Sequence, residues 1–208
     1  DVERLVADVA KALTGRRVLI REGNEIVLDP PWPRIGVYEA FAQWANIDLR
    51  QCRDRSSLYK RALEIGFASA DPQDKWDDLF NKILIEKVEP ELTKMGAVHL
   101  VDYPWQLAAL AKLKEDDPSV VERAEAYVAG IELSNGYTEL NDPEEQQIRF
   151  ARSRKSMKSA PPIDGEFILA MGRGLPPAGG VALGVDRLVM LMAGASHIAE
   201  VIAFPHQS

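Results

Sequence analysis

The sequence predicts an α+β fold, in which an antiparallel sheet is flanked by helices. Strand-like runs gather in the second half of the chain, and they follow one another without the regular helical crossovers of a doubly wound parallel sheet. The runs span 98–103, 123–128, 131–140, 181–185 and 201–204. A length of 208 residues suits one domain. We therefore expect a single domain, with a helical connecting or insert region over 1–96 and the sheet over 97–208.

The first half of the chain carries most of the helical signals. Apolar residues between Val2 and Leu13 recur at i, i+3 and i+4, which predicts an amphipathic helix that Gly15 ends. Two short apolar runs then flank Gly23-Asn24 and predict a hairpin. Further helices are predicted over 37–45, 57–65 and 74–88.

Three more helices are predicted among the later strands, over 142–157, 163–173 and 186–193. The first of them has a clear start, because Asp142 is a good N-cap residue and Pro143 suits the first helical position. Acidic residues follow in its first turn, where they favour the helix dipole. We expect this start to be structural.

Composition excludes several classes of protein. Hydrophobic residues make up 46% of the chain, so disorder is excluded. No apolar run approaches the ~18 residues of a membrane span, so we expect a cytoplasmic protein without a membrane partner. The single Cys52 and the scattered His99, His197 and His206 lack the spacing of metal ligands. The formal net charge of −7 argues against a broad basic face for nucleic acid but leaves room for a local basic patch.

A glycine-rich run near the C-terminal end is the first candidate for chemistry. Small residues at Gly180, Ala182 and Gly184 alternate with large apolar ones. In a strand this alternation leaves one face bare, as is usual where a flat group approaches the backbone. Arg187 follows at the start of the next predicted helix, where its guanidinium can hold a phosphate through a forked contact. The alternative is a strand packed under a helix, with Arg187 in a structural ion pair.

An acidic hairpin is the second candidate. We take Ala129-Gly130 as its two-residue turn. Tyr127 then faces Glu132, and Glu125 shares their face as a diagonal neighbour. Two carboxylates on one face repel each other unless a cation lies between them, and Mg²⁺ on a polyphosphate prefers one or two carboxylates plus phosphate oxygens. The alternative is a solvated edge strand, on which charge is common.

The face of the sheet on which the polar residues after Glu132 lie depends on whether their strand is regular or bulged. Simple pleating sends Asn135, Tyr137 and Glu139 to the face opposite Glu132. A bulge at Asn135-Gly136, where a positive φ is tolerated, would bring them round to the same face. A hairpin at Asn135-Gly136 is the competing interpretation, and it would set Glu132 opposite Glu139.

Together, in this order and spacing, these segments resemble the C-terminal half of the class II lysyl-tRNA synthetase catalytic core, over roughly 97–205. The stretch from Glu132 to Phe150 resembles the family's block Glu-x-x-Asn-Gly-(Phe/Tyr)-x-Glu-Leu-x-Asp…Gln…Arg-Phe. The run 180–187 resembles class II motif 3, and 201–205 resembles the closing Val-Ile-x-Phe-Pro. Because several independent motifs coincide, the resemblance outweighs the structural alternative for each one alone.

The resemblance implies a ligase that uses ATP and Mg²⁺. A lysine carboxylate would attack the α-phosphorus of ATP, giving an acyl-adenylate and pyrophosphate. Carried over by motif, Glu125 and Glu132 are the magnesium and ATP carboxylates, and Arg187 contacts the γ-phosphate. Glu132 and Arg187 are thus the expected catalytic pair. The expected floor beneath the adenine consists of Gly180, Ala182 and Gly184.

The resemblance also implies a lysine pocket. Asn135, Tyr137 and Glu139 would form it, with Glu139 meeting the side-chain ammonium. Ser134 would add bulk near the backbone of the amino acid, where α-lysine and β-lysine differ.

Within the family, the closer resemblance is to the shortened paralogues GenX or PoxA, the elongation factor P–(R)-β-lysine ligases. Ala182 stands where the tRNA synthetases usually carry Gly, and Ala199-Glu200 stands where they usually carry Arg-Asp. Ser134 takes a position that is Gly in the synthetases and bulkier in the ligases. The insert before residue 97 is compact, as in the ligases. The acyl acceptor would then be a lysine amine of elongation factor P, and the substrate lysine or (R)-β-lysine.

The alternative is the core of a lysine–tRNA ligase, in which a ribose hydroxyl of tRNA(Lys) accepts the acyl group. The run 107–112 and the ending Phe204-Pro205 resemble the tRNA synthetases more than the elongation factor P ligases. Motif 1, the dimer element, and motif 2, with its ATP-binding arginine, do not appear in these residues. We therefore expect a C-terminal fragment of a longer, homodimeric enzyme, inactive in adenylate formation by itself. A catalytically dead binding module is a third interpretation.

Overall fold

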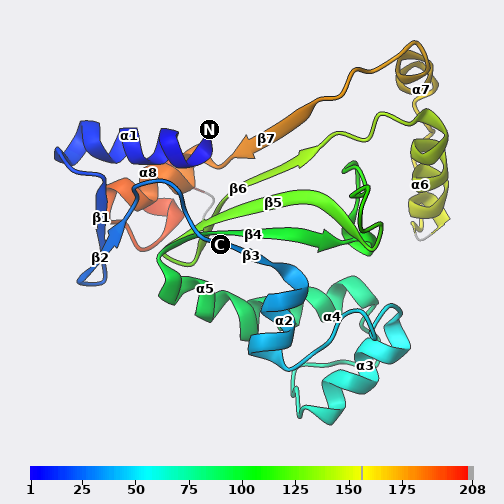
Figure 1. Cartoon of the computed structure of the whole chain (residues 1–208), viewed down its shortest axis with the longest axis horizontal. Helices are drawn as coiled ribbons and strands as arrows, with labels where there is room; N and C mark the ends of the chain where they lie inside the picture. The colour runs from blue at the N-terminus through cyan, green and yellow to red at the C-terminus, as the bar shows by residue number, and fades with distance from the viewer. Residues whose placement is uncertain (156, 206–208) are drawn as a thin grey trace.

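The computed structural model describes residues 1–155 and 157–205. Its main element is a five-stranded sheet in the order β3-β4-β5-β6-β7 (Figure 1). The antiparallel strands are β4 (Ala97–Pro104), β5 (Val120–Val128), β6 (Ile131–Thr138) and β7 (Gly179–Leu183). The sheet confirms the predicted α+β class. At one edge β3 (Arg34–Gly36) pairs parallel with β4, a strand that the sequence did not predict because three residues show no periodicity.

The helices cover the two faces of the sheet in separate groups (Figure 1). On one face, α1 (Val2–Thr14) and α8 (Val185–Ala193) share a buried cluster with the hairpin of β1 (Val18–Arg21) and β2 (Asn24–Val27). The other face carries α2 (Val37–Ala45), α3 (Arg55–Glu64), α4 (Trp76–Ile83) and α5 (Glu89–Met95). This second group covers mainly β4, so the same face of β6 and β7 is left open.

An arm leaves the sheet between β6 and β7. It contains α6 (Pro143–Lys155) and α7 (Gly165–Gly172), which lie at one end of the molecule (Figure 1). The predicted cap of α6 is confirmed, because a side-chain oxygen of Asp142 accepts the backbone N–H groups of Glu144 and Glu145. Residue 156, at the end of the predicted helix, lies outside the described residues.

Local signals fixed most of the helix ends. Gly15 ends α1 in a left-handed conformation, with a φ of 79°. The expected helices over 37–45 and 186–193 match α2 and α8, whereas the expected helix over 74–88 becomes α4 and a π-helical turn over 84–88 that leads into α5.

Within the described residues, no helix is both long enough and apolar enough to cross a membrane.

Two local predictions were wrong. The turn of the first hairpin is Glu22-Gly23 and not Gly23-Asn24, since Arg21 pairs with Asn24 and both turn residues have positive φ. The strand predicted over 201–204 is absent, because the 3₁₀ turn Ile198–Glu200 runs into further turns with no neighbouring strand to pair with. His206 lies outside the described residues.

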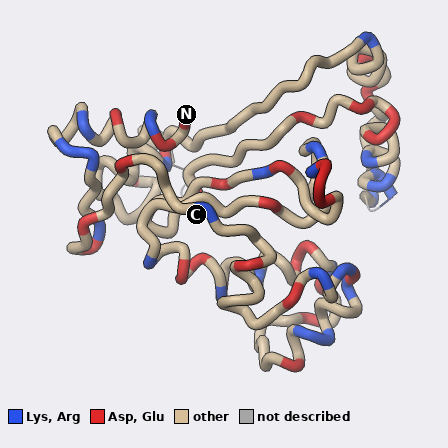
Figure 2. Tube along the Cα trace, viewed as in Figure 1, with Lys and Arg blue, Asp and Glu red and all other residues tan. Residues whose placement is uncertain are grey.

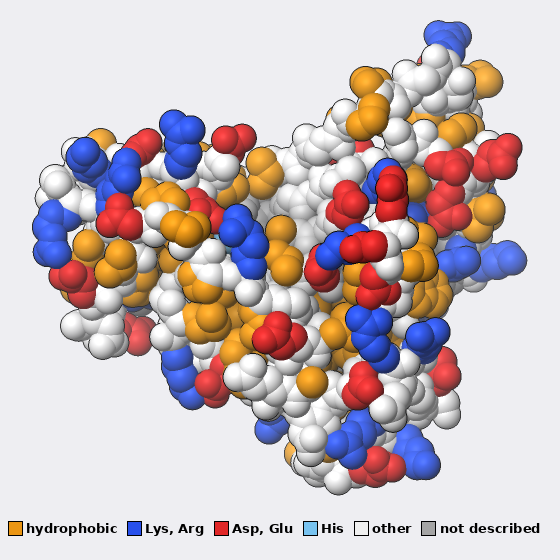
Figure 3. Space-filling view, in the orientation of Figure 1, with side chains coloured by type: hydrophobic (Ala, Val, Ile, Leu, Met, Phe, Trp, Pro, Cys, Tyr) orange, Lys and Arg blue, Asp and Glu red, His pale blue; other side chains and the backbone are white. Residues whose placement is uncertain are grey.

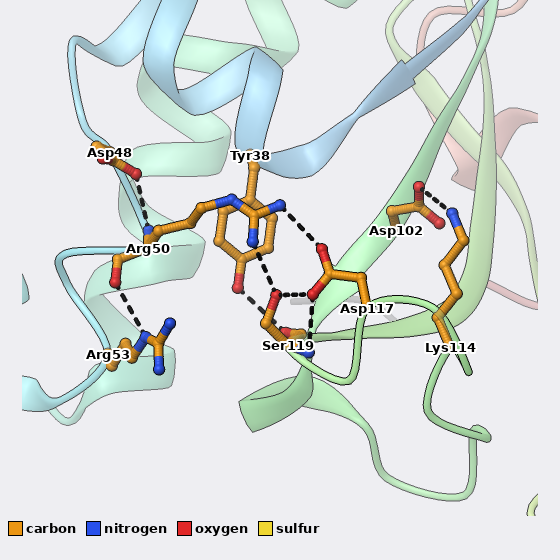
Figure 4. A network of polar contacts seen from close by, with 8 residues as sticks. All are labelled: Tyr38, Asp48, Arg50, Arg53, Asp102, Lys114, Asp117 and Ser119. Atoms are coloured by element: carbon orange, nitrogen blue, oxygen red, sulfur yellow. Dashed lines mark hydrogen bonds and ion pairs between the residues drawn. The ribbon is translucent and has the colours of Figure 1, made fainter.

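A polar network ties the helical layer to the loop before β5 (Figure 4). Arg50 donates to Asp117 Oδ2 at 2.9 Å and to Ser119 Oγ at 3.1 Å, and Tyr38 donates to the Ser119 carbonyl at 3.2 Å. On the same loop, Lys114 donates to Asp102 Oδ2 at 3.0 Å. Hydrogen bonds from Ser119 and Arg50 lower the pKa of Asp117 to about 2.

We expect Arg50→Gln to lower the melting temperature at neutral pH by about 1–3 °C, as for a half-exposed ion pair. The depressed pKa of Asp117 contributes stability above its unfolded pKa of about 4, and this contribution is lost as the pH falls toward 2. The difference between variant and wild type should therefore fade between about pH 4 and pH 2. Thermal unfolding followed by circular dichroism across this range measures it, and a pH-independent difference would contradict the assignment.

Candidate active site

An extra residue in β6 decides which side chains share the open face of the sheet. Tyr127 of β5 pairs with Glu132, but the next residue, Ala126, pairs with Ser134, so Leu133 is the inserted residue of a β-bulge. Asn135 consequently lies opposite Glu125, on the face that also carries Glu132. The place predicted for the bulge, Asn135-Gly136, is wrong, because these residues pair in register and the bulge falls at Leu133, but its expected effect on Asn135 is observed. The competing hairpin at Asn135-Gly136 is wrong, because β6 runs through these residues.

The glycine-rich strand β7 extends this face. Gly180 pairs with Tyr137 and Ala182 pairs with Asn135, and both small residues are exposed. A Cβ at Gly180 would lie 2.9 Å from Oε1 of Glu139, so a larger residue there would displace this carboxylate from its place against the strand. The structure thus brings the three expected lysine-pocket residues Asn135, Tyr137 and Glu139 together beside the expected adenine floor.

Glu125 is the buried centre of the site. Only 6% of its surface is exposed, and four side chains donate to its two oxygens. Arg123 donates at 2.6 Å and Asn135 at 3.3 Å to Oε1, while Tyr103 at 2.5 Å and Tyr127 at 3.1 Å donate to Oε2. Arg123 also donates to the side-chain oxygen of Asn135 at 3.2 Å. Glu125 therefore orients Arg123 and Asn135, and its magnesium role stays a prediction, since a metal would have to replace these donors.

Glu132 is the accessible carboxylate of the pair. Its side chain is 37% exposed, and one nitrogen of Arg187 donates to both its carbonyl oxygen, at 2.7 Å, and its carboxylate, at 3.2 Å. Arg187 comes from the first turn of α8 and passes close to Gly184, where a Cβ would lie 3.2 Å from the Cδ of the arginine. The predicted pair of Glu132 and Arg187 thus lies together on the open face. An ion pair of Arg187 is also what the alternative from the sequence analysis predicts, namely a strand packed under a helix with Arg187 in a purely structural role.

A third carboxylate, Glu89, was missed by the sequence predictions. It lies in the first turn of α5, and burial, together with the charges of Glu132 and Glu125, raises its pKa. The nearby Tyr127 hydroxyl lowers this pKa and so partly offsets the rise. Nothing in the helical pattern of 74–95 marks this glutamate, because only the packing of α5 on β5 brings it to the site. Arg123 was missed as well, although its alternation with Glu125 along one strand is a usable signal.

Ser134 is separated from the other predicted lysine-pocket residues. Its cross-strand neighbours are Ala126 and Leu183, which pack in the cluster on the opposite face of the sheet. Cross-strand neighbours share a face, so Ser134 points away from Asn135. Ala182, by contrast, places its methyl group on the open face.

The donor set of the site fits one Mg²⁺ with phosphate. Within the described residues, no group of three or more His, Cys, Asp and Glu side chains is arranged to hold a metal ion by itself. Mg²⁺ needs only one or two carboxylates when phosphate oxygens supply further ligands, and Glu132 is the exposed carboxylate that could provide one.

Glu89→Gln is expected to raise the melting temperature at about pH 7–8 by about 1–3 °C. Because the folded pKa of Glu89 is raised, wild-type stability falls as the pH rises through that pKa, and glutamine removes this cost. The gain should vanish as the pH falls below the unfolded pKa of about 4.3, where the wild-type carboxyl becomes protonated in both states. Glu86→Gln, at an exposed position of the π-helical turn, is the matched control. A loss of stability in Glu89→Gln at neutral pH would show that the charged carboxylate stabilises the fold.

The sequence comparisons define the class of protein to which this chain belongs. Residues 2–208 match the family model described as tRNA synthetases class II (D, K and N), so the chain belongs to this family. It is 38% identical over 208 residues to the lysine–tRNA ligase of Pelotomaculum thermopropionicum, covering 98% of this chain and 41% of that protein. The lysine–tRNA ligase of Chloroflexus aurantiacus is 35% identical over 209 residues, which cover 99% of this chain and 42% of that protein.

A third relative, the lysine–tRNA ligase of Dehalococcoides mccartyi strain BAV1, is 37% identical over 215 residues, covering 98% of this chain and 41% of that protein. The chain therefore spans about two fifths of the length of these relatives. The match confirms the expected class II synthetase family, whose relatives here are named ligases. The sequence resemblance to class II lysyl-tRNA synthetases is likewise confirmed.

Proposed function

We propose that this chain provides the lysine- and ATP-binding face of a ligase of the lysine–tRNA ligase type. The observation that carries the proposal is one open sheet face on which the pair Glu132–Arg187, the bare strand β7 and the group around Glu139 adjoin one another. A phosphate-binding end and an ammonium-binding end on the same face are what an enzyme needs to join lysine to ATP.

Charge supports this assignment. Four carboxylates, Glu89, Glu125, Glu132 and Glu139, border the face, against the two guanidinium groups of Arg123 and Arg187. Such an excess of negative charge favours cationic ligands, namely the ammonium group of lysine and a metal ion that accompanies ATP. Glu139 follows the last residue of β6, whereas Glu132 lies near its start, and this spacing separates an ammonium site from a phosphate site.

The proposed reaction joins two substrates held on this face. The carboxylate of lysine attacks the α-phosphorus of ATP, the bond from that phosphorus to the bridging oxygen breaks, and pyrophosphate leaves. Arg187 would hold a phosphate oxygen by exchanging the carboxylate of Glu132 for it, while keeping its bond to the Glu132 carbonyl. The protein contributes mainly position and charge, and no covalent bond to the enzyme is required.

Mg²⁺ would supply charge neutralisation at the phosphates when bound. Glu132 would hold it, with Glu125 as a further ligand if Arg123 and the tyrosines release one of its oxygens. The bare backbone of Gly180, Ala182 and Gly184 would take the flat adenine ring.

A pair of substitutions separates the two ends of the face. Arg187→Ala should weaken ATP binding about tenfold or more, because a charge-assisted hydrogen bond is lost, with little effect on lysine. Glu139→Gln should weaken lysine binding by a similar factor and ATP binding much less. Isothermal titration of ATP–Mg²⁺ and of lysine against the full chain measures both.

Arg16→Ala and Glu64→Gln, exposed side chains on the β1–β2 side and on α3, are the matched controls. Equal losses of both ligands in Arg187→Ala and Glu139→Gln, in step with a fall in melting temperature, would support the purely structural role of these residues.

The acyl acceptor is the second part of the proposal. The relatives are lysine–tRNA ligases, which favours the ribose hydroxyl of a tRNA(Lys) as the acceptor. Transfer of lysine or (R)-β-lysine to a lysine of elongation factor P is the second candidate. Its specific support is Ala182, whose methyl group lies beside Asn135 on the open face at a position where tRNA synthetases usually carry glycine.

Ala182→Gly should shift binding from (R)-β-lysine toward α-lysine by about fivefold or more if the second candidate holds, since one methyl group in a pocket has an effect of this order. Ser134→Gly, on the opposite face, should leave the ratio unchanged, contrary to the role that the sequence resemblance implies for it. Competition binding of the two amino acids with ATP present measures the ratio. An unchanged ratio in Ala182→Gly favours the tRNA acceptor.

A further inference from the structure

A cavity of about 810 Å³ lies between α6, the start of α4 and the 3₁₀ turn η2 (Trp105–Leu107). Its size is in the range of small-molecule sites, and most of its lining is apolar. Three aromatic side chains contribute to this lining, namely Trp76, Trp105 and Phe150. Walls of this kind favour a flat, apolar ligand.

Two glutamine amides of the lining lack hydrogen-bond partners. Gln146 is 1% exposed, and its Nε2 donor is buried without an acceptor among the described residues. The Oε1 acceptor of Gln106 is buried and unpaired as well, although its Nε2 donates to the carbonyl of Arg53 at 2.8 Å. Buried polar groups are nearly always hydrogen-bonded, because an unpaired one costs free energy. The cavity therefore offers a donor and an acceptor that a ligand can pair.

The charge of the lining favours an anion. Four cationic side chains stand against two carboxylates, namely Lys75, Arg123, Arg149 and Arg152 against Asp77 and Glu145. Figure 2 shows acidic residues at one end of α6 and basic residues at the other, and blue side chains project from that end of the molecule in Figure 3. The active face has the opposite balance, with four carboxylates against two guanidinium groups. The cavity thus selects a different class of ligand from the active face.

We propose that this cavity is a second ligand site of the chain, and that it binds a small aromatic carboxylate that also carries an N–H group. The ring would lie against Trp105, whose own ring is 38% exposed. A carboxylate oxygen would accept a hydrogen bond from Gln146 Nε2, and the N–H group would donate to Gln106 Oε1. Lysine lacks a ring and carries a positive side chain, so it suits the acidic active face and not this cavity.

Arg123 connects this cavity to the active face. It lines the cavity and donates to the Leu107 carbonyl at 3.2 Å, while its other nitrogens bind Glu125 and Asn135. An anion in the cavity attracts this guanidinium and competes with Glu125 for it, which would loosen the network that orients Asn135. A bound carboxylate should therefore weaken the binding of lysine, an expectation that rests on the proposed function.

The experiment titrates the ¹⁵N-labelled full chain with indole-3-acetate and follows its N–H signals by NMR. We expect a dissociation constant below about 1 mM, as for a ligand of this size, with the largest shifts at the side-chain signals of Gln146, Gln106 and Trp105. Tryptamine, with an ammonium group in place of the carboxylate, should bind about tenfold or more weakly. Naphthalene-1-acetate, which lacks the N–H group, should bind about threefold or more weakly. No binding of indole-3-acetate, equal binding of tryptamine, or tighter binding of ATP at these signals would overturn the proposal.

Two variants test the place of the ligand. Gln146→Leu removes the unpaired donor at nearly constant volume, so it should weaken the binding of indole-3-acetate about fivefold, while the melting temperature stays the same or rises. A lower melting temperature with unchanged binding would show that Gln146 serves only the fold. Leu110→Trp, in the lining, should fill the cavity and weaken binding about tenfold or more, whereas Leu63→Trp, at an exposed position of α3, is the matched control. Equal weakening in both tryptophan variants would overturn the assignment to this cavity.

The coupling to the active face is tested by titrating lysine with and without bound indole-3-acetate. The affinity for lysine should fall about fivefold when the cavity is filled, and lysine should weaken the binding of indole-3-acetate by the same factor. Equal affinities for lysine would overturn the coupling. Binding of indole-3-acetate by a chain that binds no lysine would refute the proposed function and leave the cavity site standing, whereas binding of lysine alone would do the reverse.

Discussion

The arrangement of side chains on the open face of the sheet depends on the inserted Leu133 in β6. A strand alternates its side chains, so without this residue Asn135, Tyr137 and Glu139 would lie under the sheet, against α1 and α8. The bulge buries Leu133 in that cluster, where it is 1% exposed, and returns the following polar residues to the face of Glu132. A hydrophobic anchor on one face thus sets the position of the polar groups on the other.

The second level of organisation is the set of donors around Glu125. A carboxylate with so little exposure is stable only when its charge is matched and its oxygens are hydrogen-bonded. Arg123 supplies the charge, and two tyrosines and Asn135 supply the remaining bonds. Burial raises the pKa of Tyr103 and of Tyr127, and the adjacent carboxylate adds to this effect, so both hydroxyls remain donors at physiological pH. These bonds hold Glu125 in place, whereas Glu132 and Arg187 form a more exposed pair with fewer hydrogen bonds.

Most helices and the four long strands could be predicted from the sequence, because amphipathic periodicity, the Asp142 cap and the Gly15 stop are local signals. The Ala129-Gly130 turn also gave the pairing of Tyr127 with Glu132 correctly. The place of the bulge could not be predicted, since the burial of Leu133 against α8 is a tertiary effect. For the same reason Glu89 was missed and Ser134 was assigned to the wrong face. The roles of the site residues toward ligands remain proposals.

The excursion through α6 and α7 separates β6 from β7 by some forty residues, yet within the described part of the chain β7 pairs only with β6, at an edge of the sheet. Closing so long a loop costs conformational entropy before any β7 hydrogen bond forms. We therefore expect the hairpin of β5 and β6 to form first, with the glycine-rich edge adding late. In native-state hydrogen exchange, β7 would then be the sheet strand that opens most readily.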